Sequence, residues 1–144
     1  MVLVDCSHFF APHIASSTSI VLAEGALYYL KDSTELQPND LVTLQSVACD
    51  AKATGNRVTL EGNASSDEKH PDQLSLRRAI DVKDRLIRHG VHSDQIAIAA
   101  YGVKRPTVSN ELPEGRALNR VLFFSAGPVS SGECSKMIRS FPRT

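Results

Sequence analysis

The sequence has no surplus of charge of either sign. Sixteen Lys and Arg residues balance 16 Asp and Glu residues, so the formal net charge is zero and the pI is about 7.0. A general nucleic-acid binder usually carries a basic surplus, and anionic membranes attract clusters of basic residues. The charge balance therefore argues against both kinds of partner.

Long apolar runs are also missing. No stretch approaches the about 18 apolar residues that a membrane-spanning helix needs. Residues 1–17 lack a basic segment, and Asp5 and His8 interrupt their apolar stretch, so they make a poor signal peptide. The residues before Cys6 are not the small ones expected before a lipidated cysteine. If the protein works in the periplasm, we expect this chain to be a mature fragment with an added Met1.

Metal and catalytic motifs are absent as well. The cysteines Cys6, Cys49 and Cys134 show no CxxC or other metal-ligand spacing. Two of them could pair in an oxidising compartment, or all three could be unconnected thiols with Cys49 in a helix core. His89 and His92 have no third metal ligand nearby in the sequence. Without a nucleophile elbow, a phosphate-binding glycine loop or a redox cysteine pair, we expect no metal, no cofactor and no enzyme activity.

What is present is an alternation of strand and helix patterns. The 144 residues, 42% of them hydrophobic, suffice for one domain with one core. We expect a leader at 1–18, a domain at 19–126 and a tail at 127–144. Apolar spacing and turn residues predict strands near 19–22 and 26–30, a helix at 38–55, a strand at 57–62, a helix at 71–90, a strand at 95–101, a helical turn at 114–118 and a strand at 121–125.

This order predicts an α/β two-layer sandwich, β-α-β-α-β-(α)-β. Pro38 and Pro71 suit the first turn of their helices, where a missing N–H costs nothing. Alternating strands and helices imply crossover connections and parallel neighbouring strands, and two helices of this length cover one face of the sheet. The continuous apolar run at 121–125 predicts a strand buried on both faces.

Three blocks of the chain resemble the OmpA-like domain family, which includes the peptidoglycan-associated and OmpA C-terminal domains. The blocks are LYY at 27–29 with TELQP at 34–38, VTLEG at 58–62 with LSLRRA at 74–79, and GVKRP at 102–106 with EGRALNR at 114–120. The last block is the most specific, because its seven positions match in register. The resemblance covers residues 20–125 and implies the OmpA C-terminal-like fold.

The resemblance also implies a function. Such domains bind the peptide stem of peptidoglycan, especially diaminopimelate, whose tip carries an ammonium and a carboxylate on one carbon. A receptor needs an anion for the first group and a fork of donors for the second, which arginine supplies bidentately. Arg78 matches the family arginine that holds this carboxylate. The alternative is that Arg78 pairs with a carboxylate on its own helix.

The loop after the second strand departs from the family pattern. The family reads Gly-His-Thr-Asp or Gly-His-Ala-Asp, whereas this chain reads Gly62-Asn63-Ala64-Ser65. Ser65 therefore stands at the aspartate position without a charge. Asp67 could take that place if the loop is shorter than usual, and otherwise it is a turn residue or helix cap. Asn63 could contact ligand amides or serve the turn.

The last block supplies two further candidates. Asn119 and Arg120 match family positions near the site, where Asn119 can bond loop backbone and Arg120 can reach a ligand carboxylate or brace the loop. For Arg116 we expect a structural role in the helical turn at 114–119.

Two functions fit these residues. The first is a non-catalytic, peptidoglycan-binding domain that anchors an envelope protein or complex to the cell wall, in the periplasm and associated with the outer membrane. The second is a degenerate OmpA-like domain that serves as a protein–protein scaffold, with other envelope proteins as partners. Arg78 and the block at 114–120 favour wall binding, while the uncharged Ser65 favours the scaffold.

Overall fold

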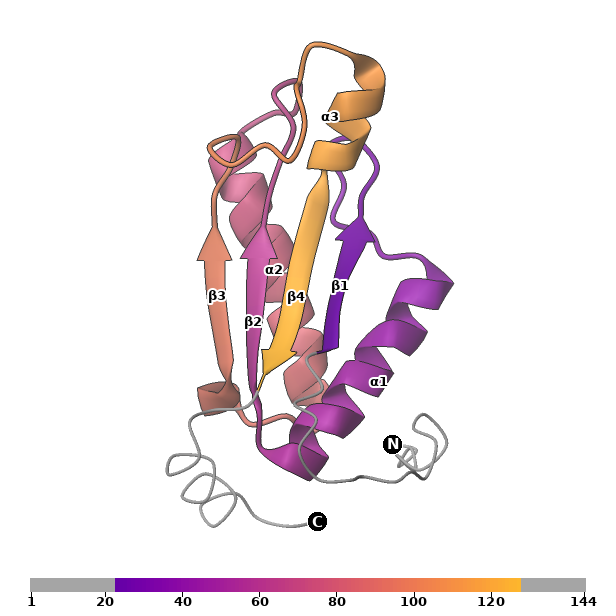
Figure 1. Ribbon diagram of the computed structural model, residues 1–144, viewed down its shortest axis with the longest axis vertical. Helices are drawn as coiled ribbons and strands as arrows, with labels where there is room; N and C mark the ends of the chain where they lie inside the picture. The colour runs from indigo at the N-terminus through magenta and orange to yellow at the C-terminus, as the bar shows by residue number, and fades with distance from the viewer. Residues whose placement is uncertain (1–22, 128–144) are drawn as a thin grey trace.

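A four-stranded sheet with two long helices on one face forms the described part, residues 23–127, of the computed structural model (Figure 1). The elements are β1 (Ala23–Tyr28), α1 (Pro38–Thr54), β2 (Arg57–Gly62), α2 (Pro71–Arg88), the short 3-10 helix η2 (Ser93–Gln95), β3 (Ile96–Ala100), α3 (Pro113–Asn119) and β4 (Val121–Gly127). They confirm the predicted order and the two-layer sandwich. The strand expected at 19–22, the leader and most of the tail lie outside the described residues.

Proline and glycine set the helix boundaries, as predicted. Pro38 and Pro71 occupy the first turns of α1 and α2. At the start of α1 the Asp40 carboxylate accepts the Gln37 backbone N–H at 3.0 Å, which satisfies one of the donors that a helix start leaves free. Gly55 ends α1 with a left-handed backbone (φ 71°), a conformation that costs glycine little.

The sheet is mixed, with strand order β1-β4-β2-β3. β2 and β3 are parallel neighbours, as the crossover through α2 predicted. β4 instead runs antiparallel to both β1 and β2, so the expectation of parallel neighbours was wrong for this strand. The reason is visible in Figure 1: the loop and α3 between β3 and β4 stay at one end of the sheet, so the chain returns in the opposite direction.

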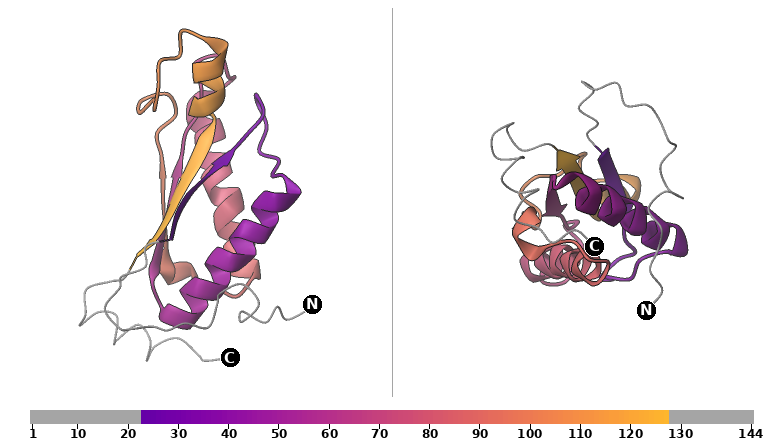
Figure 2. Two further views of the ribbon diagram at one scale, coloured as in Figure 1. Left: turned by 45° about the vertical axis from the view of Figure 1, so that its right-hand side comes forward. Right: turned by 90° about the horizontal axis from the view of Figure 1, so that it is seen from below.

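Only one face of the sheet is covered by helices (Figure 2). The strand residues on that face and the inner sides of α1 and α2 form the core, including Leu27, Leu44, Val58, Leu60, Val82, Leu86, Leu122 and Phe124. On the open face, Phe123 and Ser125 are half-buried, so the prediction that β4 is buried on both faces was wrong. A shallow depression on this face, bounded by Glu24 and Glu61, contains none of the predicted site residues.

One of the three cysteines lies in the described region. Cys49 is buried in α1 and is disulfide-bonded. The alternative of three unconnected thiols was therefore wrong. The partner of Cys49 lies outside residues 23–127. Within that range, no helix combines the length and the apolar character needed to cross a membrane.

Helix α2 lies directly against the end of β2. A Cβ added at Gly62 would lie 2.0 Å from the Ser75 backbone oxygen, so only glycine permits this approach. The Ser75 hydroxyl accepts the Gly102 N–H at 3.0 Å, which ties the chain after β3 to the same helix. This packing brings the first turns of α2 to the loops at the carboxyl ends of β2 and β3.

Candidate functional site

The predicted site residues belong to the loop 63–70, to helix α2 and to the junction of α3 with β4, and the loop and this junction lie at the same end of the sheet (Figure 1). Backbone hydrogen bonds join the chain segments there. Tyr29 donates its N–H to the Arg120 oxygen, and Asn63 donates to Val121. The segment after β1, the loop 63–70 and the start of β4 thus form one connected surface.

A buried ion pair lies beneath this surface. The Arg78 guanidinium donates to both oxygens of Glu68, Nη2 to Oε2 at 2.5 Å and Nη1 to Oε1 at 2.9 Å. Neither side chain is exposed to solvent. Bidentate, charge-assisted hydrogen bonds of this kind are stronger than neutral ones. Because neither side chain has access to water, each charge is compensated only by its partner and by protein groups.

The same pair connects three chain segments. Arg78 donates further to the backbone oxygens of Ser33, Leu30 and Asn63. Glu68 accepts the backbone N–H groups of Asp32 and Ser65. All five N–H groups of Arg78 therefore have protein acceptors, and the Tyr29 ring stacks 4.6 Å from its guanidinium carbon.

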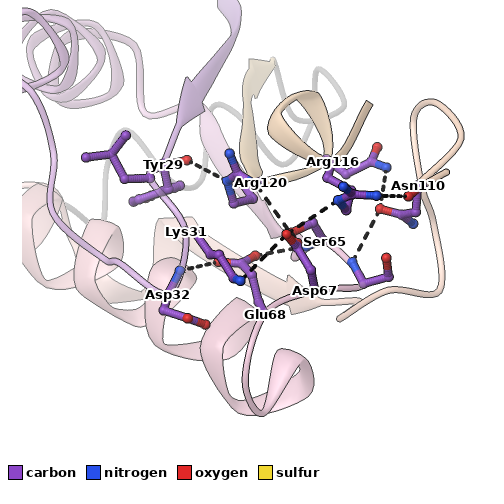
Figure 3. A network of polar contacts seen from close by, with 12 residues as sticks. Tyr29, Lys31, Asp32, Ser65, Asp67, Glu68, Asn110, Arg116 and Arg120 are labelled. Atoms are coloured by element: carbon purple, nitrogen blue, oxygen red, sulfur yellow. Dashed lines mark hydrogen bonds and ion pairs between the residues drawn. The ribbon is translucent and has the colours of Figure 1, made fainter. Parts of the chain in front are cut away.

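Above the pair lies a group of four charged side chains, which we call the Asp67 cluster: Lys31, Asp67, Arg116 and Arg120. Figure 3 shows the three cations pointing at the Asp67 carboxylate from different sides. The Asp67 oxygens lie 3.4 Å from Arg116 Nε, 3.9 Å from Lys31 Nζ and 4.0 Å from Arg120 Nη1. These distances exceed the usual N–H···O hydrogen-bond range of about 2.7–3.2 Å, so the cations interact with Asp67 through charge attraction and not through hydrogen bonds.

Asp67 is the ionised centre of the cluster. Ser65 Oγ donates to Asp67 Oδ1 at 2.6 Å. This hydrogen bond, with the charges of Lys31 and Arg116, holds the pKa of Asp67 below its ordinary value. The Asp67 side chain keeps 33% of its surface exposed, so the carboxylate is available to a ligand.

Two buried asparagines shape the surrounding loops. The Asn119 side chain accepts the N–H groups of Thr107 and Val108 and donates to the Val108 oxygen at 2.8 Å. It thereby fixes the loop before α3. The Asn63 side chain donates to the Glu61 oxygen, within its own strand end.

Burial divides the six predicted site residues into two groups. Asp67 and Arg120 have side chains that are partly exposed. The other four, Arg78, Ser65, Asn63 and Asn119, are buried and bonded to the protein itself. The structure therefore brings all six to one end of the fold but exposes the side chains of only two.

Sequence reasoning missed three members of this site. Glu68 stands in a polar loop with nothing in its spacing to link it to Arg78. Lys31 stood out only because the family commonly has an aromatic residue at that position, which suggested no role in binding. Arg116 was expected to be structural. Arg116 does have that role, because its Nη1 donates to the Asn110 and Glu111 oxygens, but its Nε also lies against Asp67. Within residues 23–127, no group of three or more His, Cys, Asp or Glu side chains is placed to hold a metal ion.

The fold and the site define a class of protein: a two-layer α/β domain with a cluster of both charge signs on the loops at one end of its sheet. The chain belongs to the OmpA family, whose family model matches residues 28–120. This finding confirms the resemblance on which the site residues were predicted.

Two curated relatives are similar in sequence. The peptidoglycan-associated lipoprotein of Pseudomonas putida is 34% identical over 107 residues, which cover 73% of this chain and 64% of the relative. The peptidoglycan-binding protein ArfA of Mycobacterium tuberculosis is 38% identical over 99 residues, which cover 67% of this chain and 30% of ArfA. The chain thus spans less than two thirds of the length of these relatives.

Solved structures share the fold. The peptidoglycan-associated lipoprotein from Burkholderia pseudomallei matches with a TM-score of 0.66 and 22% identity, over 70% of this chain and 88% of that one. The OmpA-like domain of FopA1 from Francisella tularensis matches with a TM-score of 0.65 and 19% identity, over 81% of this chain and 77% of that one. At these identities the likeness establishes the fold alone.

Proposed function

We propose that this domain binds the diaminopimelate peptide stem of peptidoglycan and anchors an envelope protein or complex to the cell wall, without catalysis. The names of the curated relatives support wall binding. The observation that carries the proposal is the Asp67 cluster, an exposed carboxylate surrounded by three cations. The proposed location is the periplasm, in a protein associated with the outer membrane.

The cluster suits the zwitterionic tip of diaminopimelate. The ligand ammonium would pair with the Asp67 carboxylate, which has the ionised form it needs. The ligand carboxylate would pair with Arg120, whose Nε is held by the Tyr29 oxygen at 3.1 Å while its Nη1 points to the cluster. Since the cations lie beyond hydrogen-bond distance from Asp67, a ligand can form shorter bonds than those it replaces.

The buried residues support this surface from below. Arg78 and Glu68 hold the segments that carry Lys31 and Asp67, while Asn119 fixes the loop before α3. The direct contact between Arg78 and the ligand carboxylate stays a prediction, because such a ligand must first displace Glu68. Direct ligand contacts through Ser65, Asn63 and Asn119 stay predictions for the same reason: their side-chain groups already bond to the protein.

Sedimentation with isolated sacculi tests the proposal. We expect the wild-type chain to sediment with sacculi, and Asp67→Asn and Arg120→Gln to remain largely in the supernatant. Arg88→Gln is the matched control, because Arg88 is exposed at the opposite end of α2. If the wild-type chain stays in the supernatant at every salt concentration, wall binding is wrong and the scaffold function takes its place.

A further inference from the structure

The charges of the Asp67 cluster do not balance. Lys31, Arg116 and Arg120 contribute three positive charges and Asp67 one negative charge, so the formal charge of the cluster is +2. The Asp67 carboxylate is the common partner of all three cations (Figure 3). A single carboxylate cannot neutralise three cations, so the cluster retains positive charge at the surface.

No other carboxylate within residues 23–127 forms an ion pair with Lys31, Arg116 or Arg120. Both carboxylate oxygens of Glu68 pair with Arg78, and this ion pair is neutral as a whole. The Asp32 carboxylate accepts the backbone N–H of Lys69 at 2.7 Å, and no ion pair links it to the cluster within residues 23–127. The surplus is thus a property of the folded surface.

The cations also keep donors for a second anion. Arg116 Nε is buried and has no hydrogen-bond acceptor among the described residues. Arg120 bonds the protein through Nε, and its terminal nitrogens have no hydrogen-bond acceptor in that part of the chain. Lys31 Nζ is 3.9 Å from Asp67, and its side chain is 54% exposed. The partly exposed side chains of Lys31 and Arg120 present these donors to an incoming ligand at the same place as the surplus charge, whereas Arg116 contributes its charge.

We propose that the Asp67 cluster selects stem peptides whose carboxyl groups are free acids over stem peptides in which a carboxyl group is amidated. This inference rests on the proposed function. The stem carries carboxyl groups on D-glutamate and on diaminopimelate, and either can exist as an acid or as a primary amide. An amide keeps the shape of the acid but removes its charge, so the cluster would remain uncompensated. Charged partners bind such donors more strongly than neutral ones.

Calorimetric titration of the full chain tests the selection. The two probes are synthetic L-Ala-D-Glu-diaminopimelate tripeptides, one with free carboxyl groups and one with the diaminopimelate side-chain carboxyl group amidated. We expect the amidated peptide to bind about tenfold more weakly at low salt. The difference should shrink at high salt, because ions screen partly exposed charges.

Substitutions identify the cluster as the source of the selection. Lys31→Gln removes one positive charge from a largely exposed side chain and leaves Asp67 and Arg120 in place. It should reduce the tenfold difference between the two peptides, whereas the control Arg88→Gln should leave it unchanged. Circular dichroism of each variant confirms that it is folded.

The outcomes separate this inference from the proposed function. Equal affinity of the wild type for both peptides would overturn the selection and the pairing of Arg120 with the ligand carboxylate, but would leave stem binding through the Asp67 carboxylate intact. A difference that persists unchanged in Lys31→Gln would also overturn it, because the charge would then act elsewhere. Binding of neither peptide would overturn the inference together with the proposed function.

Discussion

Arg78 and Glu68 form a bidentate ion pair in which neither side chain is exposed to solvent. The pair joins the segment after β1, the loop 63–70 and helix α2. Loops are usually the mobile parts of a fold, yet here they are attached to a buried charge pair. The surface that carries the Asp67 cluster is therefore held in shape before any ligand arrives.

The first prediction concerns the stability of this pair. Glu68→Gln leaves the Arg78 charge buried without its partner, which costs about 3–5 kcal/mol of unfolding free energy. Urea unfolding followed by circular dichroism measures the loss. Asp81→Asn is the control, since its ion pair with Arg85 at 3.1 Å has side chains 30% and 32% exposed and is worth at most about 1 kcal/mol. Equal losses in the two variants would contradict the importance of the buried pair.

The second prediction concerns the route of ligand binding. We expect titration with meso-diaminopimelate to shift the NMR signals of the Arg120 side chain but not that of Arg78 Nε–H. All five Arg78 donors already have acceptors, and release of Glu68 would leave a carboxylate buried and unpaired. If the Arg78 signal moves as far as that of Arg120, the ligand displaces Glu68 and Arg78 contacts it directly.

The third prediction concerns the ionisation of Asp67. The Ser65 hydrogen bond lowers the pKa of Asp67, so its contribution to folding stability is present above the pKa of the unfolded chain, about 4. That contribution is lost as the pH falls through the lower, folded-state pKa. Ser65→Ala should move the pKa of Asp67 upward, as measured by carbon NMR of the carboxyl group. An unchanged pKa in Ser65→Ala would assign the shift to the neighbouring cations.

The fourth prediction concerns the loop before α3. Asn119→Ala removes the acceptor of the Thr107 and Val108 N–H groups and the donor to the Val108 oxygen. Each hydrogen bond of this kind contributes about 0.5–1.5 kcal/mol to the unfolding free energy. Hydrogen exchange should show the Thr107 and Val108 amides losing protection while those of β2 keep theirs. Full protection in the variant would mean that other contacts hold the loop.

The fifth prediction concerns the close contact of α2 with β2. Gly62→Ala places a Cβ 2.0 Å from the Ser75 backbone oxygen, and a backbone atom cannot move aside as a flexible side chain can. We expect the unfolding free energy, measured by thermal unfolding, to fall by about 1–3 kcal/mol. Binding to sacculi should also weaken, because the loop 63–70 is displaced. A variant as stable as the wild type would show that α2 can shift without cost.

Local signals in the sequence were enough for the elements of the fold. Pro38 and Pro71 act through the restriction of their own backbone, and Gly55 acts through its freedom to adopt a left-handed conformation. Alternation of apolar residues at 57–62 reflects a strand with one buried side. These effects depend on neighbours along the chain, so they are visible without coordinates. The motifs at 74–79 and 114–120 indicated the family and singled out Arg78 and Asn119 as residues near the site.

The sequence by itself thus determined the order of strands and helices, the family and most of the residues near the site. Tertiary structure alone decided that β4 runs antiparallel to its neighbours, that Glu68 pairs with Arg78, and that Lys31 and Arg116 approach Asp67. The physical reason is that charge pairing depends on distance in space. Lys31, Asp67 and Arg116 are far apart along the chain, and Glu68 and Arg78, which are ten residues apart, belong to a loop and a helix. These side chains meet only when the sheet and its covering helices have formed.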